Sequence, residues 1–445
     1  MEECNRLDSL IRQGRSFAIY RIPGETAPRF VLQNSGSARF LYHIEDLNAR
    51  SGFVIAPFQV SEQRPIVLIR PDETELPALP ALSDPTADEF GERPGRQEKE
   101  PNRGYPPETS SKRAREASPE GGRHGTPGAT PQTSRGTGPA VSRLREASET
   151  KAAETKAFVT AASGANASSL VQGAENIPSE KELKQLYTNC FQLFTKPLLQ
   201  GKLDKLVLSR HRPLPRPARF SPGRAFYHAC RQYPRSYVYL CHTPQTGTWL
   251  GSTPEILLSG QAGAWHTVAL AGTQPLRNGE VPLVWDDKNR REQQIVAAYI
   301  RKQLRSLAIR FEESEPYAAR AGALSHLKSD FRFVLPRQNR LGDLLSLLHP
   351  TPAVCGLPKE EAYRFILRHE GYDRSYYSGF IGWLDPEGQS DLYVNLRCMH
   401  LSPERCTLYA GGGLLASSAL EDEWQETEDK LQTMKWLLNM HAQLV

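Results

Sequence analysis

The chain has 445 residues, a formal net charge of +5, seven cysteines and a hydrophobic content of 39%. Its length predicts two or three domains, and its apolar content is low for a fully packed protein of this size. No run approaches the roughly 20 apolar residues that span a bilayer, and the acidic start Met1–Cys4 lacks the apolar core of a signal peptide. The cysteines are odd in number and irregularly spaced, so neither a disulfide framework nor a zinc site is indicated. We therefore expect a cytoplasmic protein without a membrane partner, and its mild basic excess does not by itself predict nucleic-acid binding.

Residues 1–83 are predicted to be the N-terminal portion of a larger α/β body. Residues 8–13 have the pattern of a short helix. Strand patterns follow at 16–21, 29–33, 51–58 and 66–70. Because this piece alone would bury only a small core, we expect it to pack onto the rest of the body.

Residues 84–178 are predicted to be a polar, low-complexity insertion. Between positions 84 and 156 the only large apolar residues are Phe90, Tyr105, Val141 and Leu144. Such a segment cannot bury enough surface to offset the entropy lost on ordering, which predicts disorder. Its arginine clusters leave open a contact with nucleic acid or an acidic partner, although a solvated insertion is the interpretation we favour.

Residues 179–445 alternate between strand patterns and amphipathic helix patterns, as expected for a large mixed α/β domain. Helices are predicted at 179–194, 285–307, 340–348, 359–368 and 421–440. Strands are predicted at 205–209, 236–241, 249–251, 255–259, 265–270, 332–335, 378–384, 392–399 and 405–411. The glycines at 411–413 match neither the dinucleotide-binding nor the phosphate-loop motif, so no nucleotide site is assigned.

Acidic residues on the last predicted helix have a spacing that suits a cation. Glu423, Glu426 and Lys430 stand at i, i+3 and i+7 and so share one helical face. Two carboxylates three residues apart can bind Mg²⁺, which prefers oxygen ligands. Glu292 on an earlier helix could add a third carboxylate if the two helices meet. Spacing alone, however, favours a solvated charged face.

Two ionisable residues lie beside apolar strand segments. Lys205 lies within the apolar segment 203–208, and burial there would favour a neutral amine able to act as a general base. A lysine facing solvent is the commoner arrangement. Glu255 follows the turn at 251–254 and could be a general acid, or simply a charge at the start of a strand.

Three further features each have a functional and an ordinary interpretation. The glycines at 411–413 could bring backbone N–H groups close to a carboxylate, or form a tight turn. The turn at 269–273 offers a backbone donor and a hydroxyl, or is an ordinary end of a strand. Arg397, expected within a strand, could bind a carboxylate through both nitrogens or pair with an internal acid.

The order of these motifs along the chain carries more information than any one of them. They are Lys205–Arg210, Gly251–Glu255, Ala269–Thr273, His349–Ala353, Tyr377–Gly379, Tyr409–Gly413 and Glu423–Thr427. In this order they resemble the chorismate-utilising enzymes and, within that superfamily, the isochorismate synthases. The resemblance covers residues 181–445.

The resemblance implies a fold and a reaction. The fold is a mixed α/β fold of the α+β type. It has two packed, mainly antiparallel sheets, with helices outside them and the active site between them. The reaction is the Mg²⁺-dependent conversion of chorismate to isochorismate, which feeds menaquinone or catechol siderophore synthesis. Water adds at C2 of the ring while the C4 hydroxyl leaves. The resemblance also suggests a monomer.

The resemblance also implies roles for individual residues. Lys205 would be the base that activates water, and Glu255 the acid that protonates the departing hydroxyl. Mg²⁺ would be held by Glu292 and Glu426, with Glu423 acting through water. The residues implied in substrate binding are Gly272, Thr273, His326, Ala353, Tyr377, Leu396, Arg397, Gly411 and Lys430.

Some residues discriminate among related activities. Lys205 argues against the ammonia-using anthranilate type, and the absence of lysine at 271–273 argues against the aminodeoxychorismate type. Salicylate synthases, which also eliminate pyruvate, keep both Lys205 and Glu255, but tend to have threonine where this chain has Ala353. A non-catalytic binding module that uses the arginine-rich insertion is the alternative from another class.

The chain departs from the family pattern at three positions. Asn289 replaces a common acidic residue and is expected to weaken Mg²⁺ binding slightly. Gln293 stands where histidine is usual, and Cys355 where glycine or serine is common. None of the three removes a residue to which the resemblance gives a catalytic role.

Overall fold

The computed structural model describes residues 2–34, 37–74, 177–261, 263–276, 279–321, 324–335 and 340–443. The described residues on both sides of the long gap belong to one compact unit. The insertion predicted at 84–178 lies outside the described residues, apart from its last two positions. Within the described part of the chain, no helix is long and apolar enough to cross a membrane.

One sheet has eight strands, and every pair of neighbours in it is antiparallel. Its order is β14 (Gly356–Leu357), β6 (Lys205–Pro215), β18 (Arg405–Leu414), β17 (Cys398–Leu401), β8 (Gly247–Thr253), β7 (Tyr237–Thr243), β1 (Ser16–Arg21) and β2 (Arg29–Gln33). The N-terminal strands therefore extend a sheet whose other strands lie between residues 205 and 414.

The other sheet has ten strands and is likewise antiparallel. Its order is β11 (Phe311–Glu313), β13 (Leu324–Val334), β10 (Ala264–Pro275), β9 (Ile256–Gln261), β16 (Gln389–Val394), β15 (Phe380–Leu384), β4 (Gly52–Ala56), β5 (Ile66–Ile69) and β3 (Arg39–Leu41), and β12 (Tyr317–Ala321) pairs with β13. N-terminal strands thus join both sheets.

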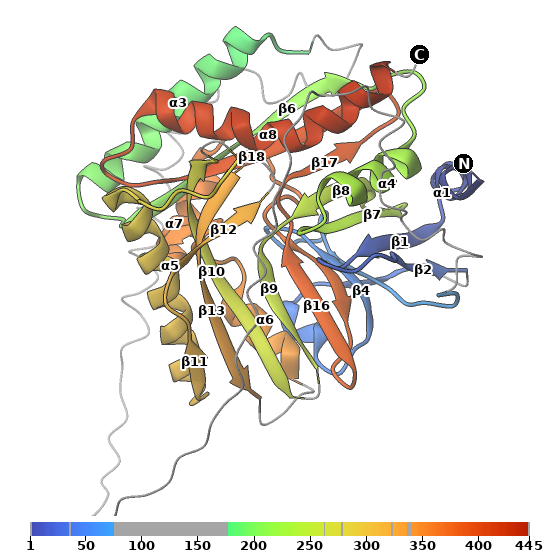
Figure 1. Cartoon of the computed structure of the whole chain (residues 1–445), viewed down its shortest axis with the longest axis horizontal. Coiled ribbons are helices and arrows are strands. Elements are labelled where there is room, and N and C mark those ends of the chain that lie inside the picture. The colour runs from blue at the N-terminus through green and yellow to red at the C-terminus, as the bar shows by residue number, and fades with distance from the viewer. Residues whose placement is uncertain are drawn as a thin grey trace, which may run out of the picture. The chain divides into compact units, whose positions relative to one another are not determined.

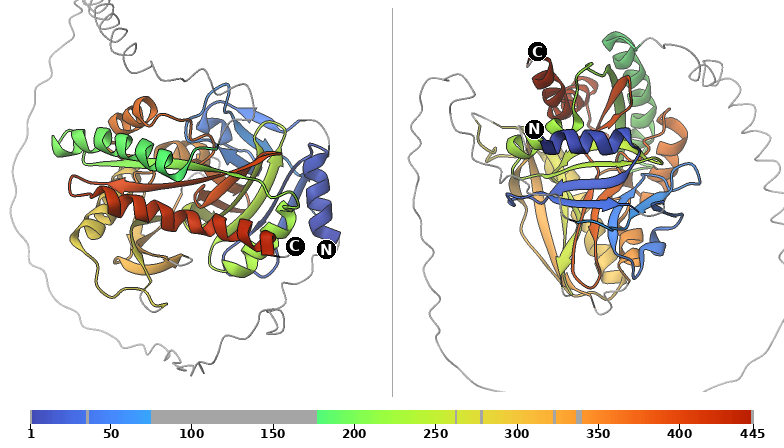
Figure 2. Two further views of the ribbon diagram at one scale, coloured as in Figure 1. Left: turned by 90° about the horizontal axis from the view of Figure 1, so that it is seen from above. Right: turned by 90° about the vertical axis from the view of Figure 1, so that its right-hand side faces the viewer.

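The two sheets pack face to face, with helices on their outer faces (Figure 1). Aromatic side chains fill the space between them, and the Tyr237 and Tyr393 rings stack with centroids 4.3 Å apart. The helices are α1 (Glu2–Arg12), α3 (Glu180–Leu199), α4 (Pro222–Gln232), α5 (Asp287–Ser306), α6 (Leu341–Leu348), α7 (Lys359–His369) and α8 (Leu420–Gln443), with a 3₁₀ turn η1 (Ile44–Leu47). Figure 2 shows α3 and α8 running along the long strands β6 and β18. The predicted fold, two packed antiparallel sheets flanked by helices, is confirmed.

Two local expectations were wrong. The strand predicted at 392–399 is two strands in different sheets, β16 and β17, because the chain crosses between the sheets at residues 395–397. Arg397 therefore lies in this connection rather than in a strand, with a φ of +46°. The glycines at 411–413 do not form a tight turn, since all of them lie in β18 and pair with β6.

Candidate active site

A cavity lies where β6, β10, β13 and β18 come together with α8. Every residue that the resemblance implied in substrate binding lines it, together with Glu255 and Glu292. Apolar walls are supplied by Val207, Leu270, Ala271, Val354 and Tyr409, to which the sequence analysis gave no individual role. All of these residues except Val354 lie within the seven motifs, but nothing else in their local sequence distinguishes them from core positions. Residues from ten separate stretches of sequence thus meet at one place, and six of the seven motifs contribute to the lining.

A β-bulge shapes one side of this cavity. The register between β10 and β13 shifts between Ala271 and Thr273, and Gly272 adopts a φ of +77°, which favours glycine. Thr273 N donates to Asn289 Oδ1 at 2.8 Å, and Asn289 Nδ2 donates to Asp286 Oδ2 at 2.6 Å. A carboxylate at position 289 could accept the first hydrogen bond but could not donate the second. The departure at Asn289 therefore fits its local role of fixing the bulge.

Histidine and arginine side chains form a chain of hydrogen bonds along the cavity wall. His326 is buried, and burial, together with the nearby charges of Arg397 and Lys430, lowers its pKa to about 3. The ring is therefore neutral. Arg397 donates to Nε2 at 3.1 Å, so the proton lies on Nδ1, which donates to Gly272 O at 3.1 Å. This fixes one tautomer and holds the guanidinium group of Arg397 at the cavity.

Glu255 lies between β8 and β9, and only 4% of its surface is exposed. Burial raises its pKa to about 7, even though Lys205, Arg397 and Lys430 act to lower it. A carboxyl group that titrates near neutral pH can hold a proton and release it during a reaction. The structure therefore places at the cavity a group with the properties of a general acid, rather than a solvated charge at the start of a strand.

Lys205, the first residue of β6, is fully buried, so the expected alternative of a solvent-facing lysine was wrong. It does not itself line the cavity. Its Nζ lies 2.9 Å from Oε1 of Glu292, which does line it. A side chain at Gly413 would collide with Glu292 Oε1 and would lie 2.8 Å from Lys205 Cε. Glycine at this position therefore lets β18 pass directly beside the ion pair.

The carboxylates of α8 lie behind the cavity and do not line it. Glu426 pairs with Lys430 at 2.6 Å, and Glu423 pairs with Lys288 at 2.5 Å. Burial and repulsion from Glu426 raise the pKa of Glu423, whereas Lys430 and Lys288 outweigh burial and lower the pKa of Glu426. The expected solvated face is therefore a buried cluster in which two carboxylates compete for positive charge. Lys288 was not predicted, because its pairing depends on α5 meeting α8.

Whether this cluster suits Mg²⁺ can be judged from its chemistry. Glu423 Oε2 is buried and has no hydrogen-bond partner among the described residues. A Cβ at Gly412 would lie 3.0 Å from that oxygen and 3.5 Å from Glu426 Oε1. Both carboxylates therefore face β18 at a position that has no side chain. These all-oxygen donors fit a hard cation. In the described part of the chain, however, no three acidic, histidine or cysteine side chains are grouped to hold a metal ion, and each predicted ligand contacts a lysine instead.

The other two departures lie away from the cavity lining. Gln293 is buried, and its Nε2 donates to Ser329 Oγ at 2.8 Å. Cys355 is buried next to α7, where its Sγ lies 3.8 Å from Lys359 O. Neither side chain lines the cavity that gathers the predicted site residues.

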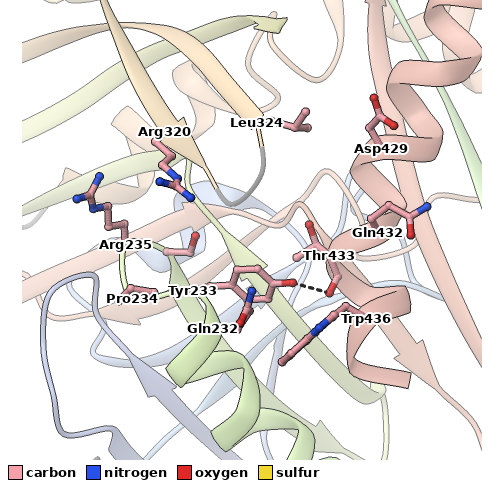
Figure 3. A pocket seen from close by; sticks show the side chains of 11 residues that line it. Gln232, Tyr233, Pro234, Arg235, Arg320, Leu324, Asp429, Gln432, Thr433 and Trp436 are labelled. Atoms are coloured by element: carbon pink, nitrogen blue, oxygen red, sulfur yellow. Dashed lines mark hydrogen bonds between the residues drawn. The ribbon is translucent and has the colours of Figure 1, made fainter. Parts of the chain in front are cut away.

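A second cavity lies elsewhere, between the segment 232–236, the end of α8, and Arg320 and Leu324 (Figure 3). Tyr233 closes one side of it by donating to Thr433 O at 3.1 Å. None of the residues predicted for catalysis, substrate or metal lines this cavity. The predicted chemistry is therefore concentrated at the first cavity.

Comparison with known proteins identifies the family. The model of a family described as "Chorismate binding enzyme" matches residues 139–439, more than half of the chain. The chain belongs to this family. The match begins before residue 181, where the resemblance of the sequence motifs begins.

Relatives within the chorismate-binding family include two isochorismate synthases of Escherichia coli strain K12. EntC is 30% identical over 273 residues, which are 60% of this chain and 69% of EntC. MenF is 33% identical over 264 residues, which are 57% of this chain and 60% of MenF. Among solved structures, DhbC from Bacillus anthracis has a TM-score of 0.65 at 19% identity and covers 98% of this chain and 99% of its own. The Escherichia coli MenF structure has a TM-score of 0.61 at 21% identity, with coverages of 97% and 91%. These structures share the fold of this chain.

Proposed function

We propose that this chain is an isochorismate synthase, an enzyme that converts chorismate to isochorismate. The observation that carries the proposal is the meeting of Glu255 and the Lys205–Glu292 pair at a cavity that also presents Arg397 and Lys430. The names of relatives such as EntC and MenF support the same reaction. The wider proposal includes a monomeric enzyme in the cytoplasm that serves menaquinone or siderophore synthesis.

The charges of the cavity suit the substrate. Chorismate carries two carboxylates, so a binding site for it needs cationic and hydrogen-bonding groups. Arg397 and Lys430 supply positive charge, and the hydroxyl of Tyr377 lies beside the strand at Gly411. Lys430 also donates to Gly411 O at 2.9 Å, which holds its ammonium group at the cavity rim. We assign the substrate carboxylates to these four residues.

The reaction needs one base and one acid, because water is a poor nucleophile and hydroxide is a poor leaving group. In our proposal Lys205 takes a proton from water as its oxygen bonds to C2, and Glu255 gives a proton to the C4 hydroxyl as the C4–O bond breaks. Both ring double bonds shift, from C1=C2 to C1=C6 and from C5=C6 to C4=C5, so that one water is added and one water is lost. Each proton transfer contributes about 10²–10⁴-fold to the rate.

The metal is part of the proposal as well. Glu292, Glu423 and Glu426 are the residues that would hold Mg²⁺, and the bound ion would offset the negative charge of a substrate carboxylate. Glu292 also contacts Lys205 Nζ at 2.9 Å, so the ion and the proposed base would share this carboxylate. The lysines that contact the three carboxylates, Lys205, Lys288 and Lys430, would then share their surroundings with the ion.

The test is a product assay. Purified protein is mixed with chorismate and Mg²⁺, and the products are resolved by chromatography. Formation of isochorismate without pyruvate is expected. Pyruvate together with salicylate would instead identify a salicylate synthase, and the absence of any conversion would overturn the proposal.

A further inference from the structure

A buried ion pair lies just outside the cavity lining. Arg374 and Glu370 are 2% and 5% exposed. Arg374 donates to both carboxylate oxygens of Glu370, from Nε to Oε2 at 2.5 Å and from an Nη to Oε1 at 2.6 Å. This is the two-point arrangement in which a planar guanidinium group fits a carboxylate. Neither residue lines the cavity, and neither is assigned a role by the proposed reaction.

The remaining donors of Arg374 reach the backbone of two cavity walls. One Nη donates to Val354 O at 2.7 Å, and the other donates to Val207 O at 2.9 Å. Both valines line the cavity. Val207 lies on β6 two residues after Lys205, and Val354 directly follows Ala353. One side chain therefore adds a further link between the strand of the proposed base and the neighbouring segment, where Cys355 O already accepts from Val207 N at 2.8 Å.

Glu370 connects the same strand a second time. Its Oε1 accepts from Ser209 N at 2.7 Å and from Ser209 Oγ at 2.8 Å. The backbone of Arg374 also accepts, from Tyr377 N at 3.0 Å. Ser209 is the partner of Gly411 in the pairing of β6 with β18. The ion pair therefore contacts three segments that supply proposed site residues.

We propose that Arg374 and Glu370 are positioning residues, which set the place of Lys205 relative to the segment of Ala353. The inference rests on the proposed function, because it concerns the geometry of that reaction. Arginine suits this task since its fixed fork of five N–H donors serves the carboxylate and both carbonyls at once. Lysine keeps the charge but offers a single ammonium group, which cannot reach all of these acceptors together.

The chain provides a matched control. Arg21 is also 2% exposed and also donates to backbone carbonyls, those of Tyr233 at 2.6 Å, Pro234 at 3.0 Å and Ser236 at 2.9 Å. These carbonyls belong to the segment that lines the second cavity (Figure 3). Arg21→Lys therefore makes the same chemical change at an equally buried position away from the proposed active site.

The experiment compares the full-length chain with Arg374→Lys and Arg21→Lys. For each, kcat and KM for chorismate are measured per folded molecule, well below the melting temperature. Because small misplacements of catalytic groups cost about 10²-fold, we expect kcat of Arg374→Lys to fall about 10- to 100-fold with a smaller change in KM. Arg21→Lys should lower the melting temperature but keep kcat.

The outcomes separate the inference from the function on which it rests. An active wild-type chain with an unchanged kcat in Arg374→Lys would overturn the inference and leave the function standing. A wild-type chain without isochorismate synthase activity would overturn both. If Arg374→Lys does not fold, Glu370→Gln places an amide N–H against Arg374 Nε while keeping side-chain volume. The same fall in kcat is expected there, and a full kcat would again overturn the inference.

Discussion

The pH dependence of catalysis should report the ionisation of Glu255. Burial raises its pKa to about 7, so about half of the molecules hold the proton at pH 7 and about a tenth hold it at pH 8. If this carboxyl group is the general acid, kcat/KM falls about tenfold for each pH unit above 7. Glu255→Gln cannot donate the proton, so its kcat should be lower by about 10²–10⁴-fold and should lack this pH limb.

The pH dependence of stability provides an independent measure of the pKa of Glu255. The pKa of Glu255 is about 7 in the folded chain, against 4.5 for an ordinary glutamate. The folded state therefore holds the proton more tightly, and this contribution to stability is present below pH 4.5 and is lost as the pH rises to about 7. The loss amounts to at most about 3 kcal/mol. Glu255→Gln removes the ionisation, so its free energy of unfolding relative to wild type should rise between pH 5 and pH 8.

Urea unfolding at these two pH values measures that difference, and initial rates between pH 6 and pH 9 at saturating Mg²⁺ measure the kinetics. A stability difference that does not change with pH would show that Glu255 is ionised in the folded chain. A flat rate profile, with Glu255→Gln within tenfold of wild type, would refute its role as the acid.

Three further variants test the other parts of the site. Lys205→Gln keeps a hydrogen-bond donor for Glu292 but removes the base, so kcat per folded molecule should fall about 10²–10⁴-fold; a kcat within tenfold of wild type would contradict the role of the base. The thermal midpoint should fall as well, because Glu292 loses its buried counter-charge. Gly413→Ala forces a methyl group against Glu292 and should cost about 1–3 kcal/mol of stability and most of the activity, as measured by thermal unfolding and initial rates; a fully active variant would contradict the close packing. Glu426→Gln should raise the Mg²⁺ concentration for half-maximal binding about tenfold or more by calorimetric titration, whereas Glu428→Gln on the same helix should not; equal effects would argue against a metal site at Glu426.

The sequence predicted the elements whose patterns are local. The strands at 16–21 and 29–33 were predicted with the bounds they have, because their residues fit a strand whichever sheet they join. The break at 395–397 was not predicted, since it is held by distant partners. Asn395 N donates to Gly379 O at 2.8 Å, and Tyr239 donates to the Asn395 side chain at 2.5 Å. Apolar residues on both sides of the break gave the pattern of one continuous strand.

In the candidate site, too, some features followed from local sequence patterns and others depended on contacts between distant segments. Local patterns did not decide whether Lys205 and Glu255 are catalytic groups or ordinary charged residues. Their burial depends on what packs against the strand and not on the strand itself. Motif order, through the family resemblance, predicted the substrate-binding residues, Glu255 and Glu292, which line the cavity, whereas the predicted Lys205, Glu423 and Glu426 do not line it.

Motif order did not predict that Lys205 pairs with Glu292, that Lys288 pairs with Glu423, or that Arg374 and Glu370 form a buried pair, because these contacts depend on how α5, α7 and α8 approach the sheets. Ion pairs between residues far apart in the chain, such as Lys205–Glu292 and Lys288–Glu423, leave no spacing signal in one sequence.

The most direct test of the central claim follows the oxygen atom. If the cavity activates water for attack at C2, isochorismate formed in H₂¹⁸O should carry one ¹⁸O in its ring hydroxyl, as measured by mass spectrometry, and recovered chorismate should carry none beyond the amount set by the reverse reaction. Product that forms at the full rate without the label would mean that the C4 hydroxyl itself is transferred. That result would contradict the proposed roles of Lys205 and Glu255.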